Sequence, residues 1–185
     1  MMFYKPEHWM LTYTGKKIDP FNVPSYLVCI EDIAHALAYQ CRYNGHCNRF
    51  YSVAEHSILI SQALERDGRG IDAAKWGLFH DASEAYVGDL VSPVKKQIDK
   101  AFKSAENRIE KVVAEVFGLS GKIPATVHEY DTRIRKDEME SLFRFIYTPE
   151  EYMTRIAPLS VPITGWLPEE AESRFIIRYK ELWPK

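Results

Sequence analysis

The chain has 185 residues, of which 46% are hydrophobic and 27% are charged, and its formal net charge is −2. These values are typical of a globular chain that can bury a core, and we expect one domain over residues 1–185 with its core motifs within 30–146. The charge balance favours neither a nucleic-acid partner nor an anionic membrane. No apolar run approaches the roughly 20 residues that span a bilayer. The absence of a signal-peptide core and of a CxxC pair among the three cysteines predicts a cytoplasmic protein.

Residues 1–29 are expected to be irregular, because they contain prolines at positions 6, 20 and 24. Turn residues at Thr14-Gly15 allow a short hairpin there. From Ile30 onward the pattern of apolar residues is helical nearly throughout, and the first helix is predicted over about 30–41.

The second helix is predicted to begin at Ser52 and to end near position 65. Ser52 and Glu55 fit the S-x-x-E capping box, in which each side chain bonds to the backbone of the other. The third helix is predicted from Asp72, which is a favourable N-cap residue, to about position 86.

The fourth predicted helix has the most regular apolar stripe, and Gly118 is expected to end it. Its members recur at helical spacing: Ile98, Phe102, Ala105, Ile109, Val112, Val113 and Val116. A fifth helix is expected over about 125–145, and a short one at the capping signal 148–151, where proline occupies the first helical position. The last helix is predicted over about 168–182. No set of alternating strands is present, so the predicted fold class is all-α.

An imidazole and two carboxylates lie close together in the third predicted helix, at His80, Asp81 and Glu84. At about 100° per residue, Asp81 lies about 100° and Glu84 about 40° from His80, so all three share one face. Gly77 lies one turn earlier on that face and is expected to leave space beside it. Aromatic neighbours indicate that this helix is buried, where isolated charges are costly. A divalent cation is the natural partner for such a group.

Further ligands are expected from neighbouring helices. His56 follows the apolar stripe of the second helix, and Asp131 follows the stripe of the fifth. Taken singly, His56 is more typical of a core histidine, and Asp131 of a cap or a hydrogen bond between helices. Their combination with His80 and Asp81 favours a metal site. Two imidazoles and two carboxylates suit a transition metal such as Mn, Fe, Co, Ni or Zn.

Three sequence runs, at 51–57, 80–95 and 129–131, resemble those of HD-domain phosphohydrolases. They are most similar to compact bacterial 5'-deoxynucleotidases and to phage enzymes that hydrolyse dATP. The resemblance covers about residues 30–145 and implies a compact helical bundle. It also implies that the metal is bound by the residues that match the family's ligands: His56, His80, Asp81 and Asp131.

The same resemblance implies that Glu84 and Asp89 act in catalysis around the attacking water. A bound cation lowers the pKa of water from 15.7 towards about 7–9. Glu84, one turn beyond the ligands, is then placed to orient or deprotonate that water. Asp89 follows Gly88 and is expected to supply a proton to the leaving oxygen, although a turn residue without a catalytic role would look the same.

Substrate contacts are expected from residues on both sides of the motif. Arg42 and Lys95 offer cations for a phosphate, the alternative being solvated surface charges. Arg42-Tyr43 resembles the family's arginine-aromatic pair, with tyrosine in place of the tryptophan that is common there. Pro93 is expected near a purine base, and His46 near the phosphate.

Together these features predict metal-dependent hydrolysis of phosphate from 2'-deoxynucleotides, with deoxyadenine nucleotides including dATP favoured. A triphosphate substrate would bring additional Mg or Mn. The alternatives are a 5'-deoxynucleoside monophosphatase of broad base specificity, a non-catalytic nucleotide-binding HD protein, and a cyclic-nucleotide hydrolase. Intact Glu84 and Asp89 disfavour the second, and the segment 88–95 disfavours the third. We expect a homo-oligomer, in a bacterial cytosol or in a host cytosol if the chain is phage-encoded.

Overall fold

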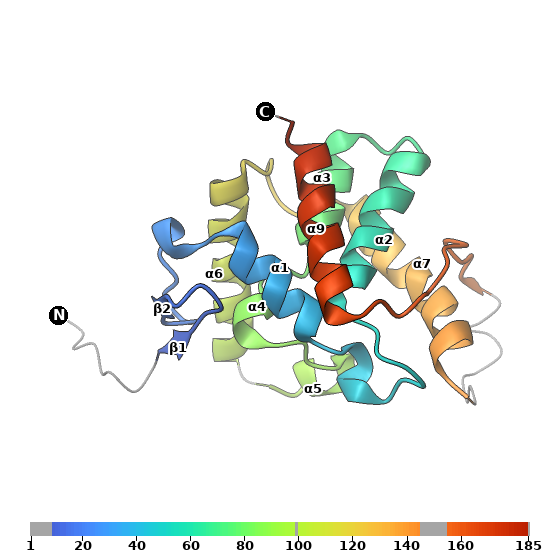
Figure 1. Cartoon of the computed structure of the whole chain (residues 1–185), viewed down its shortest axis with the longest axis horizontal. Coiled ribbons are helices and arrows are strands. Elements are labelled where there is room, and N and C mark those ends of the chain that lie inside the picture. The colour runs from blue at the N-terminus through green and yellow to red at the C-terminus, as the bar shows by residue number, and fades with distance from the viewer. Residues whose placement is uncertain (1–8, 99, 145–154, 185) are drawn as a thin grey trace.

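A computed structural model of the chain describes residues 9–98, 100–144 and 155–184, which form a bundle of helices (Figure 1). The predicted all-α class is confirmed. Within the described residues, the strands are confined to one antiparallel hairpin, in which β1 (Met10–Leu11) pairs with β2 (Lys17–Ile18). The hairpin turns at Gly15, whose φ of 82° suits glycine, so the predicted short hairpin is also confirmed.

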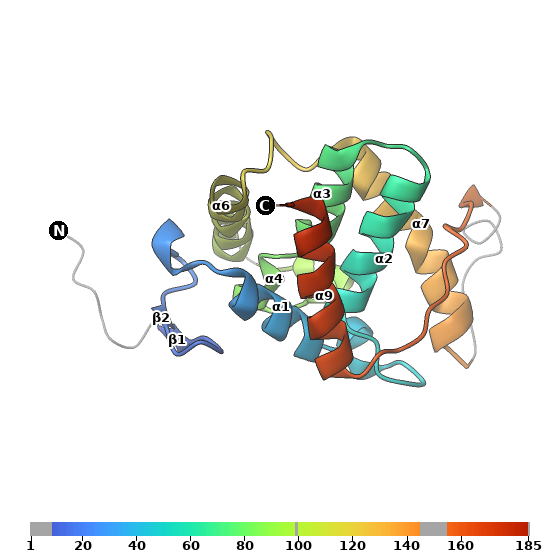
Figure 2. The same cartoon turned by 45° about the horizontal axis from the view of Figure 1, so that its top comes forward.

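The centre of the bundle is formed by α1 (Ile30–Tyr39), α2 (Val53–Arg66), α3 (Ile71–Phe79) and α9 (Pro168–Leu182). Helix α2 contacts the other three, and α9 also packs on α1 and α3. Figures 1 and 2 show α6 (Lys100–Phe117) and α7 (Ala125–Leu142) on opposite sides of this centre. Every residue from Val53 to Ser61 is buried, so α2 presents no polar face to water along this stretch. None of the helices in the described parts of the chain combines the length and apolarity needed to cross a membrane.

The beginning of α2 confirms one half of the predicted capping box and shows that the other half is wrong. The hydroxyl of Ser52 accepts the backbone N–H of Glu55 at 3.0 Å, as expected for an N-cap. The buried carboxylate of Glu55 turns away from this cap. It accepts three backbone N–H groups from residues 164–166, at 2.9, 3.0 and 2.6 Å. Three donors satisfy a buried charge better than one, and they attach the segment before α9 to the beginning of α2.

The third helix is not continuous, which corrects the prediction. It begins at Ile71 after Gly70, so Asp72 lies in the first turn and is not the N-cap. Helix α3 ends at Phe79, and α4 (Glu84–Val87) follows. Between them the backbone bonds run from each residue to the third before it, as from Glu84 N to the carbonyl of Asp81 at 2.9 Å. This tighter winding aligns residues three apart, so Glu84 follows Asp81 more closely than a regular α-helix predicts.

The region after the motif also differs from the expectation. Pro93 and Lys95 lie in a single helical turn, α5 (Ser92–Lys95), which the sequence did not predict. Proline near the start of this turn supplies a suitable fixed φ. Ile98 is 38% exposed and precedes α6, so it does not belong to that helix's buried stripe. The short helix predicted at 148–151 lies outside the described residues.

Gly77 packs α3 directly against α2, so the open space expected beside it is absent. A Cβ atom at this position would lie 2.7 Å from Leu64 Cδ1 and 3.1 Å from Ser61 Cα. The missing side chain therefore allows the two helices to approach closely. As a result, the rings of His56 and His80 lie with their centroids 5.3 Å apart.

Replacing Gly77 with alanine should lower the free energy of unfolding. Overpacking costs about 1–3 kcal/mol, and the higher helix propensity of alanine offsets about 1 kcal/mol of this, so we expect a net loss of up to about 2 kcal/mol. Urea denaturation followed by circular dichroism measures the change. Gln62→Ala, on the exposed side of α2, is the control and should stay within about 0.5 kcal/mol. A Gly77→Ala protein more stable than the wild type would contradict this account of the helix contact.

Candidate metal centre and active site

His56 of α2, His80 at the end of α3 and Asp131 of α7 converge on one point. One ligand atom from each of these side chains lies within 4.8 Å of the other two. Asp81 joins them, because its Oδ2 lies 3.2 Å from His80 Nε2 and 3.7 Å from His56 Nε2. Asp131 Oδ1 is 3.3 Å from His56 Nε2. The structure thus brings together all four residues that the sequence suggested as metal ligands.

The two imidazoles are held so that each Nε2 faces this point. His56 Nδ1 lies 2.6 Å from Oε1 of Glu138, and His80 Nδ1 lies 2.8 Å from the carbonyl oxygen of Gly77. If each Nδ1 carries the proton and donates it, each Nε2 keeps a free lone pair. Both Nε2 atoms are buried and have no hydrogen-bond partner among the described residues. Two such nitrogens beside two carboxylates fit a divalent cation of the kind that imidazole and carboxylate ligands bind.

The charges at this point are strongly coupled. Burial lowers the pKa of His80, but the negative charges of Asp81 and Asp131 outweigh it and raise this pKa to about 9. A cation bound at this point would therefore displace the second proton of the His80 ring at neutral pH. Burial acts in the opposite direction on the two carboxyl groups, and the histidines outweigh it there as well. The pKa values of Asp81 and Asp131 are therefore held well below their usual range. Both aspartates are ionised at neutral pH and supply the negative charge that a cation requires.

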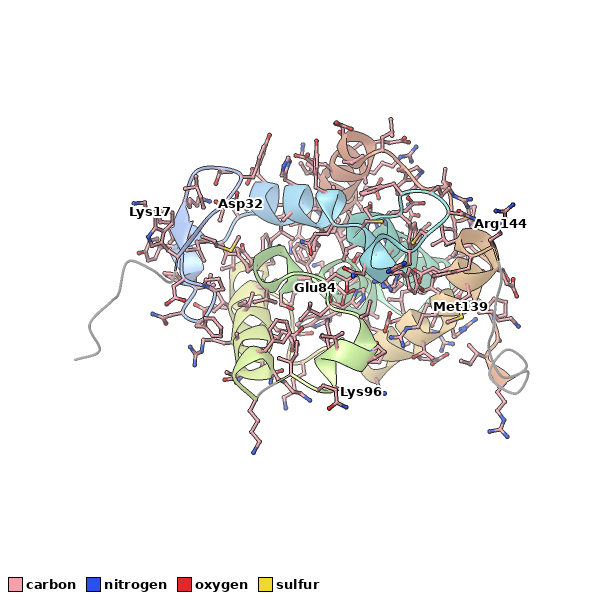
Figure 3. The ribbon with its side chains drawn as sticks, turned by 90° about the horizontal axis from the view of Figure 1, so that it is seen from below. Lys17, Asp32, Glu84, Lys96, Met139 and Arg144 are labelled. Atoms are coloured by element: carbon pink, nitrogen blue, oxygen red, sulfur yellow. The ribbon has the colours of Figure 1, made fainter. Side chains whose placement is uncertain are left out.

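Glu84 lies beside the metal centre and is almost completely buried. Its Oε1 accepts from Lys95 Nζ at 2.6 Å, while Oε2 is buried without a partner among the described residues. Burial and the charges of Asp81 and Asp89 raise the pKa of Glu84 to about 9, although Lys95 opposes this shift. Figure 3 shows Glu84 near the middle of its view, with Met139 on α7 to its right. A raised pKa and a free oxygen are the properties of a group that exchanges protons.

Gln40, at the end of α1, holds both candidate catalytic residues in place. Its side-chain amide donates to the carbonyl oxygen of Glu84 at 3.0 Å and accepts the backbone N–H of Asp89 at 2.9 Å. Burial raises the pKa of the Asp89 carboxyl group, which favours its protonated form. The sequence reasoning missed Gln40, because a glutamine at a helix end belongs to no recognisable motif.

A cavity of about 390 Å³ opens beside these groups. Six residues predicted for catalysis or substrate binding line it: Arg42, Tyr43, Glu84, Asp89, Pro93 and Lys95. His46 is exposed and does not line the cavity, so the structure does not place it with the other candidates. The lining also includes residues that the sequence reasoning missed: Leu90, Val91, Ser92, Arg135 and Met139.

Each cation that lines this cavity already faces a carboxylate. Arg42 Nη1 lies 3.6 Å from Asp81 Oδ2. Lys95 Nζ bonds to Glu84 and also lies 3.3 Å from Glu106 of α6. Arg135 pairs with Asp131 one turn earlier on α7. The cavity is therefore close to balanced in charge and is not strongly positive.

Glu138 is a fully buried carboxylate of α7 that contacts both the metal centre and the cavity wall. Besides His56, it accepts the hydroxyl hydrogens of Tyr43 and Tyr51. Burial raises the pKa of Glu138, but Arg42 and His56 outweigh it and lower this pKa to about 2. The sequence reasoning missed Glu138, although its spacing of seven residues from Asp131 indicates the same helix face. A glutamate is usually exposed, so its type alone does not indicate that it lies on the buried stripe of this helix.

Residues 42–45 form a short helical segment, η3 (Arg42–Gly45), with unusual backbone angles. Tyr43 and Asn44 have φ values of 55° and 53°, in the left-handed region that residues other than glycine rarely adopt. The Tyr43 ring packs edge-on against Phe143, with centroids 5.1 Å apart. The strained backbone and this contact fix the ring at the wall of the cavity.

Comparison with known proteins places this geometry in a family. The family model for the YfbR-like 5'-deoxynucleotidases matches residues 38–148. An uncharacterized protein of Rhodobacter capsulatus is 36% identical over 124 residues, which are 64% of this chain and 63% of that protein. The uncharacterized protein YfdR of Escherichia coli is 36% identical over 108 residues, 58% of this chain and 57% of that protein. The matches thus span less than two thirds of the length of these relatives.

Removal of a proposed ligand should abolish metal binding. His80→Ala and Asp131→Ala should each lower the affinity for Co²⁺ or Mn²⁺. The loss should exceed the roughly 10–100-fold that is expected for a residue outside the ligand set. Equilibrium dialysis with elemental analysis measures the bound metal. His128→Ala, an exposed position on α7, is the control and should bind as the wild type does. A folded His80→Ala protein with full metal occupancy would refute the ligand assignment.

Proposed function

Because the chain belongs to the YfbR-like 5'-deoxynucleotidase family of HD-domain proteins, we propose that it hydrolyses phosphate from 2'-deoxynucleotides with a divalent transition metal. The observation that carries this proposal is the pair of unpartnered imidazole nitrogens beside Asp81 and Asp131, at the edge of a cavity that contains Glu84 and Asp89. Ligands, proton-exchanging groups and a substrate-sized cavity lie together there. A non-catalytic nucleotide-binding protein would have no need for the buried Glu84.

In this proposal His56, His80, Asp81 and Asp131 hold the cation, which when bound supplies positive charge and lowers the pKa of a water molecule. Glu84 accepts the proton of the attacking water at Oε2, the oxygen without a partner. Lys95, bonded to Oε1, and the positive charge of a bound cation favour the ionised form of Glu84, which is the form that accepts this proton. Asp89 donates a proton to the oxygen that leaves phosphorus, so that one P–O bond forms and one breaks. Arg42, which lines the cavity, orients the phosphate with its guanidinium group.

The charge of the cavity favours a short phosphate chain. From the sequence we favoured deoxyadenine nucleotides including dATP, with monophosphates as the alternative. The lining contains three cations (Arg42, Lys95 and Arg135) and four carboxyl groups (Asp81, Glu84, Asp89 and Asp131). With all four ionised, a bound divalent cation would leave a balance of only about +1, which suits a monophosphate better than a triphosphate. We therefore propose 5'-deoxynucleoside monophosphates as the main substrates. dATP is the second candidate and would need additional Mg or Mn to neutralise its chain.

The sugar and the base are assigned to different walls of the cavity. The Tyr43 ring is fixed by its contact with Phe143 and by its hydroxyl, so it cannot move aside to accept a larger sugar. A close ring crowds a 2'-hydroxyl, which favours deoxyribose. Apolar side chains near Pro93 offer a surface for the base, and a purine gains more contact area there than a pyrimidine. We therefore propose a preference for deoxyadenine.

Three further predictions from the sequence concern the whole chain and stay predictions here. They are a single domain over residues 1–185, assembly into a homo-oligomer, and a cytoplasmic location. The expected partner is a free nucleotide, with no nucleic acid and no membrane.

Replacing Glu84 with glutamine should separate catalysis from metal binding. The variant should keep its metal and lose about 10²–10⁴-fold in turnover, because a neutral amide cannot accept the water's proton. Released phosphate measures turnover, and elemental analysis measures the metal. Glu106→Gln serves as the matched control. Glu106 is the other carboxylate near Lys95, but it does not line the cavity. Near-normal turnover in Glu84→Gln would remove Glu84 from the mechanism.

A substrate panel tests the specificity. With Co²⁺ or Mn²⁺, dAMP should be hydrolysed faster than AMP, and faster than dATP. Tyr43→Ala should narrow the preference for deoxyribose over ribose, because the ring that crowds the 2'-hydroxyl is lost. Tyr26→Ala, at an exposed tyrosine, should leave the ratio unchanged. Equal rates on dAMP and AMP, or turnover of cyclic nucleotides alone, would contradict the proposed substrate.

A further inference from the structure

The two carboxylate oxygens of Glu138 have separate sets of partners. Oε1 lies 2.6 Å from His56 Nδ1 and accepts the hydroxyl of Tyr51 at 2.9 Å. Oε2 accepts the hydroxyl of Tyr43 and lies 3.5 Å from Arg42 Nη2. The first set belongs to the proposed metal centre, and the second belongs to the segment 42–45 at the cavity wall.

We propose that Glu138 is a positioning residue that serves both metal binding and recognition of the nucleotide sugar, with one oxygen assigned to each task. The inference rests on the proposed function. It concerns a residue that does not itself hold the metal, because Glu138 bonds to Nδ1 of His56 and the imidazole ring separates it from Nε2.

Oε1 prepares His56 for a cation. A hydrogen bond from Nδ1–H to a carboxylate fixes the tautomer that leaves the lone pair on Nε2, and it raises the basicity of the ring. The ring orientation is fixed at the same time, because His56 and Glu138 are both fully buried. The Tyr51 hydroxyl, also fully buried, holds Oε1 in place through a second hydrogen bond. Loss of the charge on Glu138 should therefore weaken metal binding without removing any ligand.

Oε2 stabilises the strained segment that carries Tyr43. Left-handed backbone angles at Tyr43 and Asn44 are unfavourable for residues with side chains and persist only when the surroundings impose them. The hydrogen bond from the Tyr43 hydroxyl and the nearby guanidinium of Arg42 are the contacts with Glu138 that impose this conformation. If they are lost, the Tyr43 ring is free to leave the position that crowds a 2'-hydroxyl.

Three nearly isosteric variants separate the two tasks. Glu138→Gln should weaken Co²⁺ binding by about 10–100-fold and also reduce the ratio of kcat/KM for dAMP over AMP. Tyr51→Phe should weaken Co²⁺ binding by a smaller factor and leave the ratio unchanged. Tyr43→Phe should reduce the ratio and leave Co²⁺ binding unchanged. Titration without nucleotide, followed by the visible absorption of Co²⁺, measures affinity and reports on its ligand environment.

Matched controls test for a merely structural role. Glu55→Gln alters a fully buried carboxylate that is next to His56 in sequence. The hydrogen bonds of Glu55 are to residues 164–166. Tyr130→Phe removes a buried tyrosine hydroxyl that donates to Asp67 at 2.7 Å. Both variants should lower the melting temperature and change neither Co²⁺ affinity nor the sugar ratio. If Glu138→Gln does not fold, Tyr51→Phe and Tyr43→Phe still decide the question, because one should change only the Co²⁺ affinity and the other only the sugar ratio.

The outcomes separate this inference from the function on which it rests. A wild-type protein that binds neither Co²⁺ nor Mn²⁺, or hydrolyses no nucleotide, overturns the proposed function together with the inference. A wild-type protein that does both, while Glu138→Gln retains normal Co²⁺ affinity and a normal sugar ratio, overturns the inference alone. The same holds if Tyr51→Phe and Tyr43→Phe each change both quantities equally, because the two oxygens would then not act separately.

Discussion

Two buried histidines, His56 and His80, are held with their Nε2 atoms facing one point, and the contacts that hold them extend through much of the fold. An imidazole inside a protein adopts a defined tautomer only when a fixed acceptor takes the hydrogen of its other nitrogen. The acceptor for His80 is the carbonyl of Gly77, within its own helix, and the acceptor for His56 is Glu138, on another helix. Gly77 serves twice, because its missing side chain also brings α3 against α2. The packing of these helices and the geometry of the candidate metal centre are thus specified together.

Sequence patterns predicted those parts of the fold that local chemistry determines. Helix α9 has the predicted bounds, α6 ends at Phe117 before Gly118, and Ser52 caps α2. The tight turn after Phe79 could not be read from periodicity, since residues 80–83 are compatible with a regular helix. Their conformation depends on what the side chains contact. Glu55 departs from its predicted partner for the same reason, because three backbone donors from a distant segment compete with the local one.

The residues of the candidate site likewise differ in whether the sequence predicts them. Residues whose types are unusual in a buried helix, such as His80 and Asp81, could be found from the sequence, and the structure brings them together with His56 and Asp131. Gln40 could not, because Asp89, one of its partners, lies 49 residues away and glutamine signals no site on its own. The spacing of Glu138 from Asp131 indicates the same helix face, but its bond to His56, 82 residues away, has no signal in the sequence. His46 shows the converse error. It is close to Arg42 in sequence, but the reversal of the backbone at Tyr43 and Asn44 leaves it exposed.

The contact between Glu55 and residues 164–166 makes the matched family segment depend on chain beyond its end. That segment ends at position 148, but the buried carboxylate of Glu55, next to His56 in sequence, accepts hydrogen bonds from residues 164–166, which lie beyond that position. Backbone N–H groups are common to every residue except proline, so the donors at Thr164 and Trp166 leave no signature in their side chains. Gly165 does leave one, because its φ is 77° and a Cβ atom there would lie 2.6 Å from the carbonyl oxygen of Phe50. A relative that keeps this glutamate and shows no similarity beyond position 148 needs equivalent backbone donors from another segment of its own chain. At residues 164–166 we therefore expect divergence to be limited by backbone geometry, and at Gly165 by residue identity as well.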